Sequence, residues 1–167
     1  MNEQAGDGAG VAIYPCLWFD RDAEAAVAHY CQVFPGSRRL GAMHYAGDGH
    51  MPAGSVLTLE FELAGQRFMA MNGGIAMPPS SALSLVVECD TQAELDRLFE
   101  QLSADPAREQ CGWLVDRWGY AWQIVPRRLR ALMSSGTPAQ KGRLFERLMG
   151  MKRLDIAALE AAHAAAA

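Results

Sequence analysis

The chain has 167 residues and a mass of 18.2 kDa, which fits one domain or two small halves that share a core. Its net charge of -4 and isoelectric point near 5.5, without a stripe of Lys and Arg, exclude a nucleic-acid partner. Charges or glycines interrupt every apolar stretch before the roughly 20 residues that a membrane helix needs, so we expect no membrane partner.

The N-terminal segment, residues 1–12, is rich in glycine and acidic residues and shows no signal-peptide pattern. We therefore expect a disordered lead-in to a cytoplasmic protein. The four cysteines, Cys16, Cys31, Cys89 and Cys111, lack Cys-x-x-Cys spacing and lie in apolar runs. This pattern favours buried free thiols over disulfides or metal ligands.

The first half of the domain, about residues 13–74, shows a strand pattern, a helix pattern and three further strand patterns. Asp22 is a candidate N-cap of the helix, and Pro35 and Gly36 end it. The predicted elements are a strand at 13–19, a helix at 23–34, and strands at 39–46, 55–63 and 66–71.

The second half, about residues 81–126, begins with a buried strand at 84–89. Thr91 and Glu94 then form a capping box ahead of a second amphipathic helix. Because Asp20 and Asp90 occupy equivalent places in the two halves, about 70 residues apart, we infer an internal duplication.

The second half closes with a predicted β-hairpin rich in Trp, Val, Ile and Tyr at residues 110–126. Asp116 can bond its own backbone at the turn, and Gly119 can take a positive φ. On the second strand, alternation directs Gln123 to the face opposite Trp122. That face is either a cavity or solvent, and the tryptophans belong either to a core or to a ligand pocket.

Residues 127–167 form a predicted C-terminal helical extension. Thr137, Pro138 and Gln140 together are typical of a helix start. Asp155 is a candidate cap of a last helix. The first of these helices carries an apolar face formed by Leu144, Phe145, Leu148 and Met149, which packs either on its own sheet or on a partner subunit.

Several sequence phrases in combination resemble one protein family. They are Cys16-Leu-Trp-Phe-Asp20, Gly54-Ser-Val-Leu-Thr58, Phe61-Glu-Leu63, Gly65-Gln-Arg-Phe-Met-Ala-Met-Asn-Gly-Gly74, Leu85-Val-Val-Glu-Cys89, Gln110-Cys-Gly-Trp113, Trp122-Gln-Ile-Val-Pro126 and the closing segment 149–159. The chain is similar in these phrases to the PhnB-like branch of the vicinal oxygen chelate superfamily, which includes glyoxalases, dioxygenases and bleomycin-resistance proteins. The resemblance implies an α+β fold of tandem βαβββ units, followed by the C-terminal helical extension.

Metal-using members of this superfamily place one His, Glu or Gln ligand on each of four strands. The resemblance puts the corresponding positions at Pro15 beside Cys16, at Met69 or Met71, at Ser84 and at Gln123. Proline and thioether groups do not suit a hard divalent ion, so we expect no metal and no other cofactor.

The same branch carries a demethylubiquinone methyltransferase label. Methyl transfer from S-adenosylmethionine commonly uses a Rossmann-like sheet with a glycine-rich loop after its first strand. Here the first strand runs into Phe19-Asp20-Arg21-Asp22, without glycine, and the turn Asn72-Gly73-Gly74 follows a different kind of strand. We interpret the label as a family name and not as an activity.

Three functions remain open. The first is a metal-free binding protein whose cupped sheet holds a small, partly apolar molecule. Methionine and tryptophan would give adaptable apolar walls, and a glutamine and a serine would orient the ligand. The predicted pocket residues are Leu17, Met69, Met71, Ser84, Trp113 and Gln123, with Trp18 and Asn72 at the rim.

The second function is an enzyme, through an unusual metal site or through Cys16 or Cys111 as nucleophile. His29, His44 and His50 are the candidate bases, but no pattern brings a histidine to either cysteine. The third function is an interaction protein whose fold serves dimerisation. We expect a homodimer in any of these cases, because related tandem proteins commonly pair across subunits.

Overall fold

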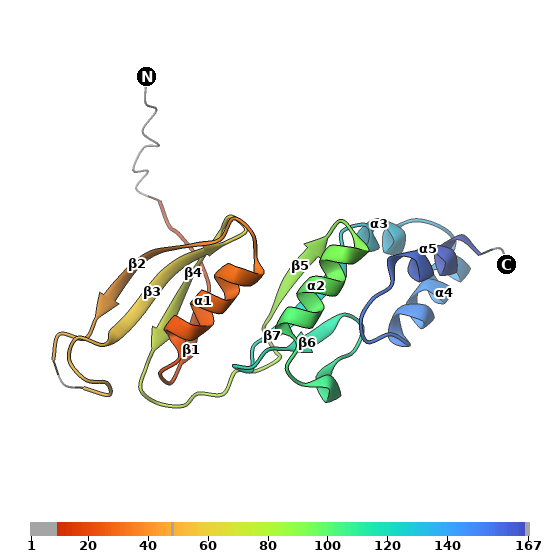
Figure 1. The fold of residues 1–167 in the computed structure, drawn as a ribbon. Helices are drawn as coiled ribbons and strands as arrows, with labels where there is room; N and C mark the ends of the chain where they lie inside the picture. Colours follow the sequence, from red (N-terminus) through yellow and green to blue (C-terminus); the bar gives the residue numbers. More distant parts are fainter. Residues whose placement is uncertain (1–9, 48, 166–167) are drawn as a thin grey trace, which may run out of the picture. The chain divides into compact units, whose positions relative to one another are not determined.

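The computed structural model describes residues 10–47 and 49–165 (Figure 1). The predicted lead-in, residues 1–12, lies outside the described residues except for its last three, which form no helix or strand. The chain divides into two compact units, residues 1–77 and 78–167, and each is described by itself. No helix in the described ranges is long and apolar enough to span a membrane.

The first unit follows the predicted order of strand, helix and three strands. Its elements are β1 (Cys16–Phe19), α1 (Ala23–Val33), β2 (Arg38–His44), β3 (Val56–Leu63) and β4 (Gln66–Asn72). The second unit repeats the strand, helix and hairpin and adds the extension. Its elements are β5 (Ser84–Cys89), α2 (Gln92–Leu102), the short 3-10 helix η1 (Pro106–Arg108), β6 (Trp113–Val115), β7 (Ala121–Pro126), α3 (Leu129–Ser134), α4 (Pro138–Met149) and α5 (Ile156–Ala164). The predicted α+β class is confirmed.

The sheet of the first unit has the strand order β1-β4-β3-β2, with β1 parallel to β4 and the other pairs antiparallel. Helix α1 lies across one face (Figure 1). Strand alternation fills the space between helix and sheet with aromatic and aliphatic side chains. Those of Leu17, Phe19, Val27, Tyr30, Leu59 and Phe61 are buried there.

Helix α1 does not begin as the sequence predicted. Asp22 stands at the N-cap position but makes no side-chain capping bond. The backbone N–H of Ala23 donates instead to the side-chain oxygen of Asn72, 2.9 Å away at the end of β4. Asp22 is therefore replaced as cap by Asn72, which lies 49 positions after Ala23 in the chain.

The sheet of the second unit has the order β5-β7-β6, with β5 parallel to β7 and β6 antiparallel to it. This order matches that of β1-β4-β3 in the first sheet, as the predicted duplication implies. Where the first unit has β2, the second has η1 and a loop whose backbone makes one isolated bridge, Gln110 to Trp113. The second sheet is thus one strand narrower in the described part of the chain.

The hairpin β6–β7 turns around the buried carboxylate of Asp116, whose exposed fraction is 4%. One oxygen accepts from the backbone N–H groups of Trp118 and Tyr120, at 2.9 and 3.0 Å. The other accepts from the indole N–H of Trp122 at 2.8 Å. With Gly119 at φ 91°, the predicted turn chemistry is confirmed, and the carboxylate also holds a core tryptophan in place.

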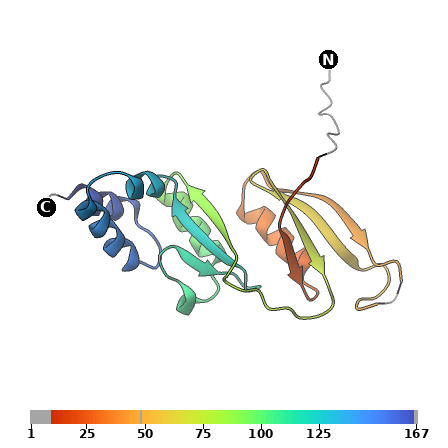
Figure 2. The ribbon, with the colours of Figure 1, turned by 180° about the vertical axis from the view of Figure 1, so that it is seen from behind.

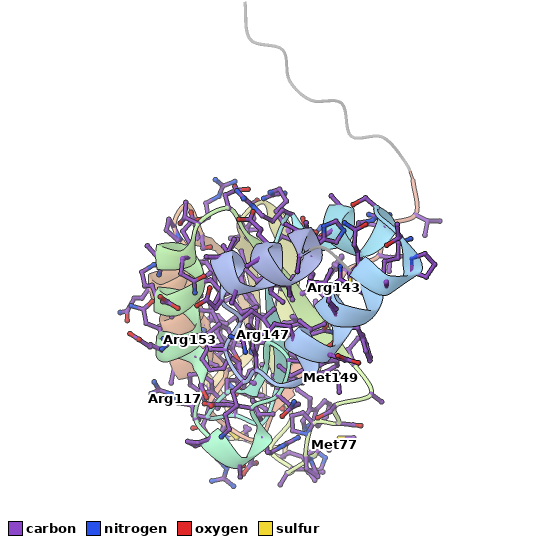
Figure 3. The ribbon with its side chains drawn as sticks, turned by 90° about the vertical axis from the view of Figure 1, so that its right-hand side faces the viewer. Met77, Arg117, Arg143, Arg147, Met149 and Arg153 are labelled. Carbon is purple, nitrogen blue, oxygen red and sulfur yellow. The ribbon has the colours of Figure 1, made fainter. Side chains whose placement is uncertain are left out.

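The C-terminal extension packs on the second unit of its own chain. The segment after α4 is bonded to the hairpin, because Cys111 N donates to Met151 O at 2.8 Å and Gly112 N donates to Lys152 O at 2.7 Å. Leu144 and Leu154 are buried by this docking. Met149 and Arg147, near the C-terminal end of α4, keep exposed side chains (Figure 3). The predicted caps at Thr137 and Asp155 are both present.

Candidate functional site

In the second unit, the sheet face opposite α2 brings together three of the predicted pocket residues. Gln123 pairs in register with Trp113 on β6, and Ser84 begins the neighbouring strand β5. The side-chain amide of Gln123 donates to the hydroxyl of Ser84 at 2.8 Å. Val86, beside Gln123 in the register, keeps 59% of its surface exposed. This face therefore combines an indole, an amide and a hydroxyl with exposed apolar surface.

The two faces of β7 differ sharply. Trp122 and Ile124 point under α2 and are 2% and 0% exposed, whereas Gln123 between them is partly exposed on the other side. The predicted orientation of Gln123 is confirmed. Its amide N–H is engaged by Ser84, while no residue of the described ranges donates a hydrogen bond to its carbonyl oxygen. That oxygen and the Ser84 hydroxyl hydrogen are the groups left for a ligand.

In the first unit, the face opposite α1 carries the sulfur and indole side chains of two neighbouring strands. Cys16 pairs in register with Met69, and Trp18 with Met71. The alternating burial of β1, exposed at Cys16 and half-buried at Trp18, places both on this face. Figure 2 shows the first sheet from behind, from the side opposite to α1. Trp18, Met69 and Met71 thus share one surface.

The indole of Trp18 is held at both ends. Its N–H donates to the carbonyl oxygen of Ile75 at 2.8 Å. Its six-membered ring lies on Gly73, where an added Cβ would stand 1.8 Å from the nearest ring atom. The Asn72-Gly73-Gly74 turn is therefore filled by a side chain of its own unit, which gives its first glycine a packing role.

Leu17 and Asn72 do not share the surface of Trp18 and Met71. Adjacent residues of a strand point to opposite faces, so Leu17 lies under α1, 2% exposed, and Asn72 lies there too, 1% exposed. Asn72 is bonded to the start of α1, to Glu24 at 2.7 Å and to the backbone of Val56 at 3.1 Å. Both residues have structural roles in the core and not the predicted positions in a pocket and at its rim.

Cys16 lies on the same face as Trp18, Met69 and Met71, but the predicted set of pocket residues did not contain it. The same alternation that removes Leu17 puts Cys16 two positions before Trp18 and on its face. Counting every second residue along 16–19 and 67–72 would have found the surface from the sequence.

The residues at the superfamily's metal-ligand positions do not fit a hard divalent ion. Met69 and Met71 offer thioethers, and the carbonyl of Pro15 is taken by the backbone N–H of Met69 at 2.9 Å. Ser84 and Gln123 are neutral and bonded to each other. Within the described residues of each unit, no three His, Cys, Asp or Glu side chains converge as a metal cluster. We therefore derive no chemical step through a divalent metal.

The Cys16 and Cys89 thiols are not prepared for nucleophilic attack. Burial raises the pKa of the Cys16 thiol above its ordinary value, and burial together with nearby acidic groups raises the pKa of Cys89 to about 11. A reactive thiol needs the opposite shift. Cys111 contacts the sulfur of Met149 at 3.4 Å and the side-chain amide of Gln110 at 3.4 Å, without a histidine among these contacts.

Comparison with known proteins shows the family and the fold of the chain. A family model described as 3-demethylubiquinone-9 3-methyltransferase matches residues 11–125, and no curated protein matches. A PhnB protein from Bacillus cereus that carries the same methyltransferase description is 29% identical, with a TM-score of 0.58, over 68% of this chain and 98% of its own.

Two more distant structures share the fold. Protein PA1353 from Pseudomonas aeruginosa is 23% identical, with a TM-score of 0.51, over 70% of this chain and 97% of its own. The fosfomycin resistance protein FosX from Listeria monocytogenes, in a variant complexed with Mn(II) and a dihydroxypropylphosphonic acid, is 14% identical, with a TM-score of 0.51, over 76% of this chain and 98% of its own. Since the family model covers more than half of the chain, this protein belongs to the PhnB-like family described as 3-demethylubiquinone-9 3-methyltransferase, within the vicinal oxygen chelate fold.

Proposed function

We propose that this protein binds a small, partly apolar molecule on the exposed face of its second sheet, without a divalent metal. The observation that carries the proposal is the arrangement of Gln123. Its amide lies between the indole of Trp113 and the hydroxyl of Ser84, with one hydrogen-bond acceptor still free. Ligand sites in proteins typically combine apolar and aromatic walls with a few such polar groups.

The arrangement predicts the chemistry of the ligand. Trp113 offers a flat apolar surface of the kind that stacks on rings, and Val86 widens it. The free carbonyl oxygen of Gln123 and the hydroxyl of Ser84 accept and donate one hydrogen bond each. These groups suit a ring-containing molecule that carries a hydroxyl or amide N–H beside a carbonyl. They offer no fixed charge, so a strongly anionic ligand is disfavoured.

Methyl transfer and metal-assisted chemistry receive less support from the same observations. The glycine turn after β4 is occupied by Trp18, and the sheet order β1-β4-β3-β2 differs from a doubly wound nucleotide-binding sheet. FosX is a relative crystallised with Mn(II), but the thioether and amide groups present here do not match such an ion.

A small-molecule thermal-shift screen tests the proposal. The wild-type protein is screened with neutral aromatic and aliphatic compounds that carry a carbonyl with a hydroxyl or amide. We expect hits to raise the melting temperature in a concentration-dependent way and to change tryptophan fluorescence. Trp113→Leu should remove the fluorescence change and most of the thermal shift, while Trp18→Phe, in the other unit, should retain both. Hits that respond equally to both substitutions would contradict the assignment to this face.

A further inference from the structure

The first sheet carries a cluster of soft sulfur donors on the face opposite α1. Cys16 on β1 and Met69 on β4 are register partners, and Met71 follows Met69 on the same face two residues later. Neighbouring strands are roughly 5 Å apart, and alternate residues of one strand roughly 7 Å. One thiol and two long, flexible thioethers therefore occupy neighbouring positions on one face of the sheet.

We propose that Cys16, Met69 and Met71 form a binding site for a soft monovalent metal ion, Cu(I). Thiolate and thioether sulfur are the donors that select Cu(I) over hard divalent ions. The feature that makes this face unsuitable for Mn(II) thus becomes the basis of its selectivity. The site lies entirely in the first unit and does not depend on the small molecule proposed for the second.

Charge balance supports a monovalent ion. On binding, the Cys16 thiol loses its proton, and one thiolate neutralises one Cu(I). Glu60, which neighbours Met69 on β3, is already ion-paired with Arg67 at 2.7 Å. The site therefore needs no further counter-charge, whereas a divalent ion would keep an unbalanced charge on a partly apolar surface.

The surroundings of the three sulfurs also suit this ion. Trp18 stands beside Met71 in the register, and its indole is fixed by the bond to Ile75 and by packing on Gly73. Methionine side chains are flexible enough to bring their sulfurs onto one ion without moving the strands.

Competition with bicinchoninate, on fully reduced protein without oxygen, measures the affinity for Cu(I). We expect one tight equivalent in the wild type. Cys16→Ser should abolish it, and Met69→Leu and Met71→Leu should each weaken it by about tenfold or more, because each removes one donor. Methionine-to-leucine changes conserve volume, so the fold should persist, as circular dichroism would verify.

The chain supplies its own matched control. In the second unit, the thiol of Cys111 and the thioether of Met149 lie 3.4 Å apart, and within the described residues no third sulfur atom hydrogen-bonds to either of them. Met149→Leu should therefore leave the tight equivalent unchanged within about twofold. X-ray absorption of the copper complex should show three sulfur neighbours. The proposal is overturned if both leucine variants at 69 and 71 bind Cu(I) as tightly as the wild type, or if copper has only two sulfur neighbours.

Discussion

The side-chain oxygen of Asn72 accepts a hydrogen bond from the backbone N–H of Ala23 at 2.9 Å, so that strand β4 caps helix α1. The same side chain donates to the carboxylate of Glu24 at 2.7 Å and to the carbonyl of Val56 at 3.1 Å. Its backbone carbonyl accepts from the hydroxyl of Tyr45 at 2.7 Å. One buried residue thus ties β4 to the helix and to β3 through its side chain, and to the loop after β2 through its backbone carbonyl.

Replacing Asn72 by Ala should lower the free energy of unfolding by about 2 to 4 kcal/mol, measured by urea denaturation. The substitution removes a helix cap and leaves the Ala23 N–H and the Val56 carbonyl without their partner. Asp22→Ala is the matched control, because Asp22 occupies the N-cap position without a side-chain capping bond, and it should change stability by less than about 0.5 kcal/mol. Equal losses in the two variants would show that Asn72 is not the cap.

The two helix starts explain which part of the fold the sequence could predict. The capping box of Thr91 and Glu94 lies within four residues, and the structure contains it as predicted. The cap of α1 comes from a residue 49 positions away, for which local patterns carry no signal. Strand and helix order follows from local periodicity, but contacts between distant segments depend on how the elements pack.

Gly73→Ala should destabilise the protein by about 1 to 3 kcal/mol, because the new methyl group would overlap the ring of Trp18. The displaced indole should show red-shifted fluorescence. Gly142 provides the opposite case, since it lies inside α4 with no atom within 4 Å of an added Cβ. Gly142→Ala should therefore stabilise the protein by up to about 1 kcal/mol. If Gly73→Ala were neutral, Trp18 would not be packed on this glycine.

The sequence could predict which kinds of residue lie in the candidate site, but not which of them share one face of a sheet. The predicted set contained Leu17 together with Trp18, and Met71 together with Asn72, although neighbours on a strand face opposite ways. The pairing of Cys16 with Met69 depends on the parallel register of β1 and β4, which are separated by a helix and two strands. Register between such strands is fixed by the whole core, so a local sequence pattern cannot supply it.

The purified, dialysed protein should contain no stoichiometric zinc, nickel, iron or manganese. The expectation follows from the donor chemistry at the four superfamily positions, where Met69, Met71 and Ser84 are poor ligands for these ions. Inductively coupled plasma mass spectrometry gives the metal content per chain. About one equivalent of any of these metals surviving dialysis would refute the expectation and favour an enzyme with an unusual ligand set.

The protein should form a homodimer in solution, as related tandem proteins commonly do. Exposed apolar side chains are available for an interface, among them Phe145 and Met149 on α4, at 51% and 47% exposure. Light scattering coupled to size exclusion should give twice the chain mass. A monomer at micromolar concentration, unchanged on dilution, would contradict the prediction.

Substitution of Gln123 distinguishes a ligand-binding role from a purely structural role in the sheet. Replacing it by Leu substitutes an apolar group of similar volume for a half-buried amide whose side-chain hydrogen bond within the described chain is the one to the Ser84 hydroxyl. The loss of one side-chain hydrogen bond at a partly exposed position costs little, and added apolar surface offsets it. We expect the variant to unfold within about 1 kcal/mol of the wild type.

Ligand binding should respond far more strongly than stability. If the free carbonyl oxygen of Gln123 accepts a hydrogen bond from the ligand, Gln123→Leu should reduce the ligand-induced stabilisation by about 1 to 3 kcal/mol. Ser84→Ala removes the hydroxyl that pairs with Gln123, and it should weaken the binding of the same ligands while leaving the sheet intact. A structural role predicts the reverse: both variants would lose stability and keep every ligand-induced shift. Melting temperatures of the three proteins, measured with and without each hit, distinguish the two outcomes. A ligand site predicts a smaller ligand-induced shift at nearly unchanged stability, whereas a structural role predicts a lower stability at an unchanged ligand-induced shift.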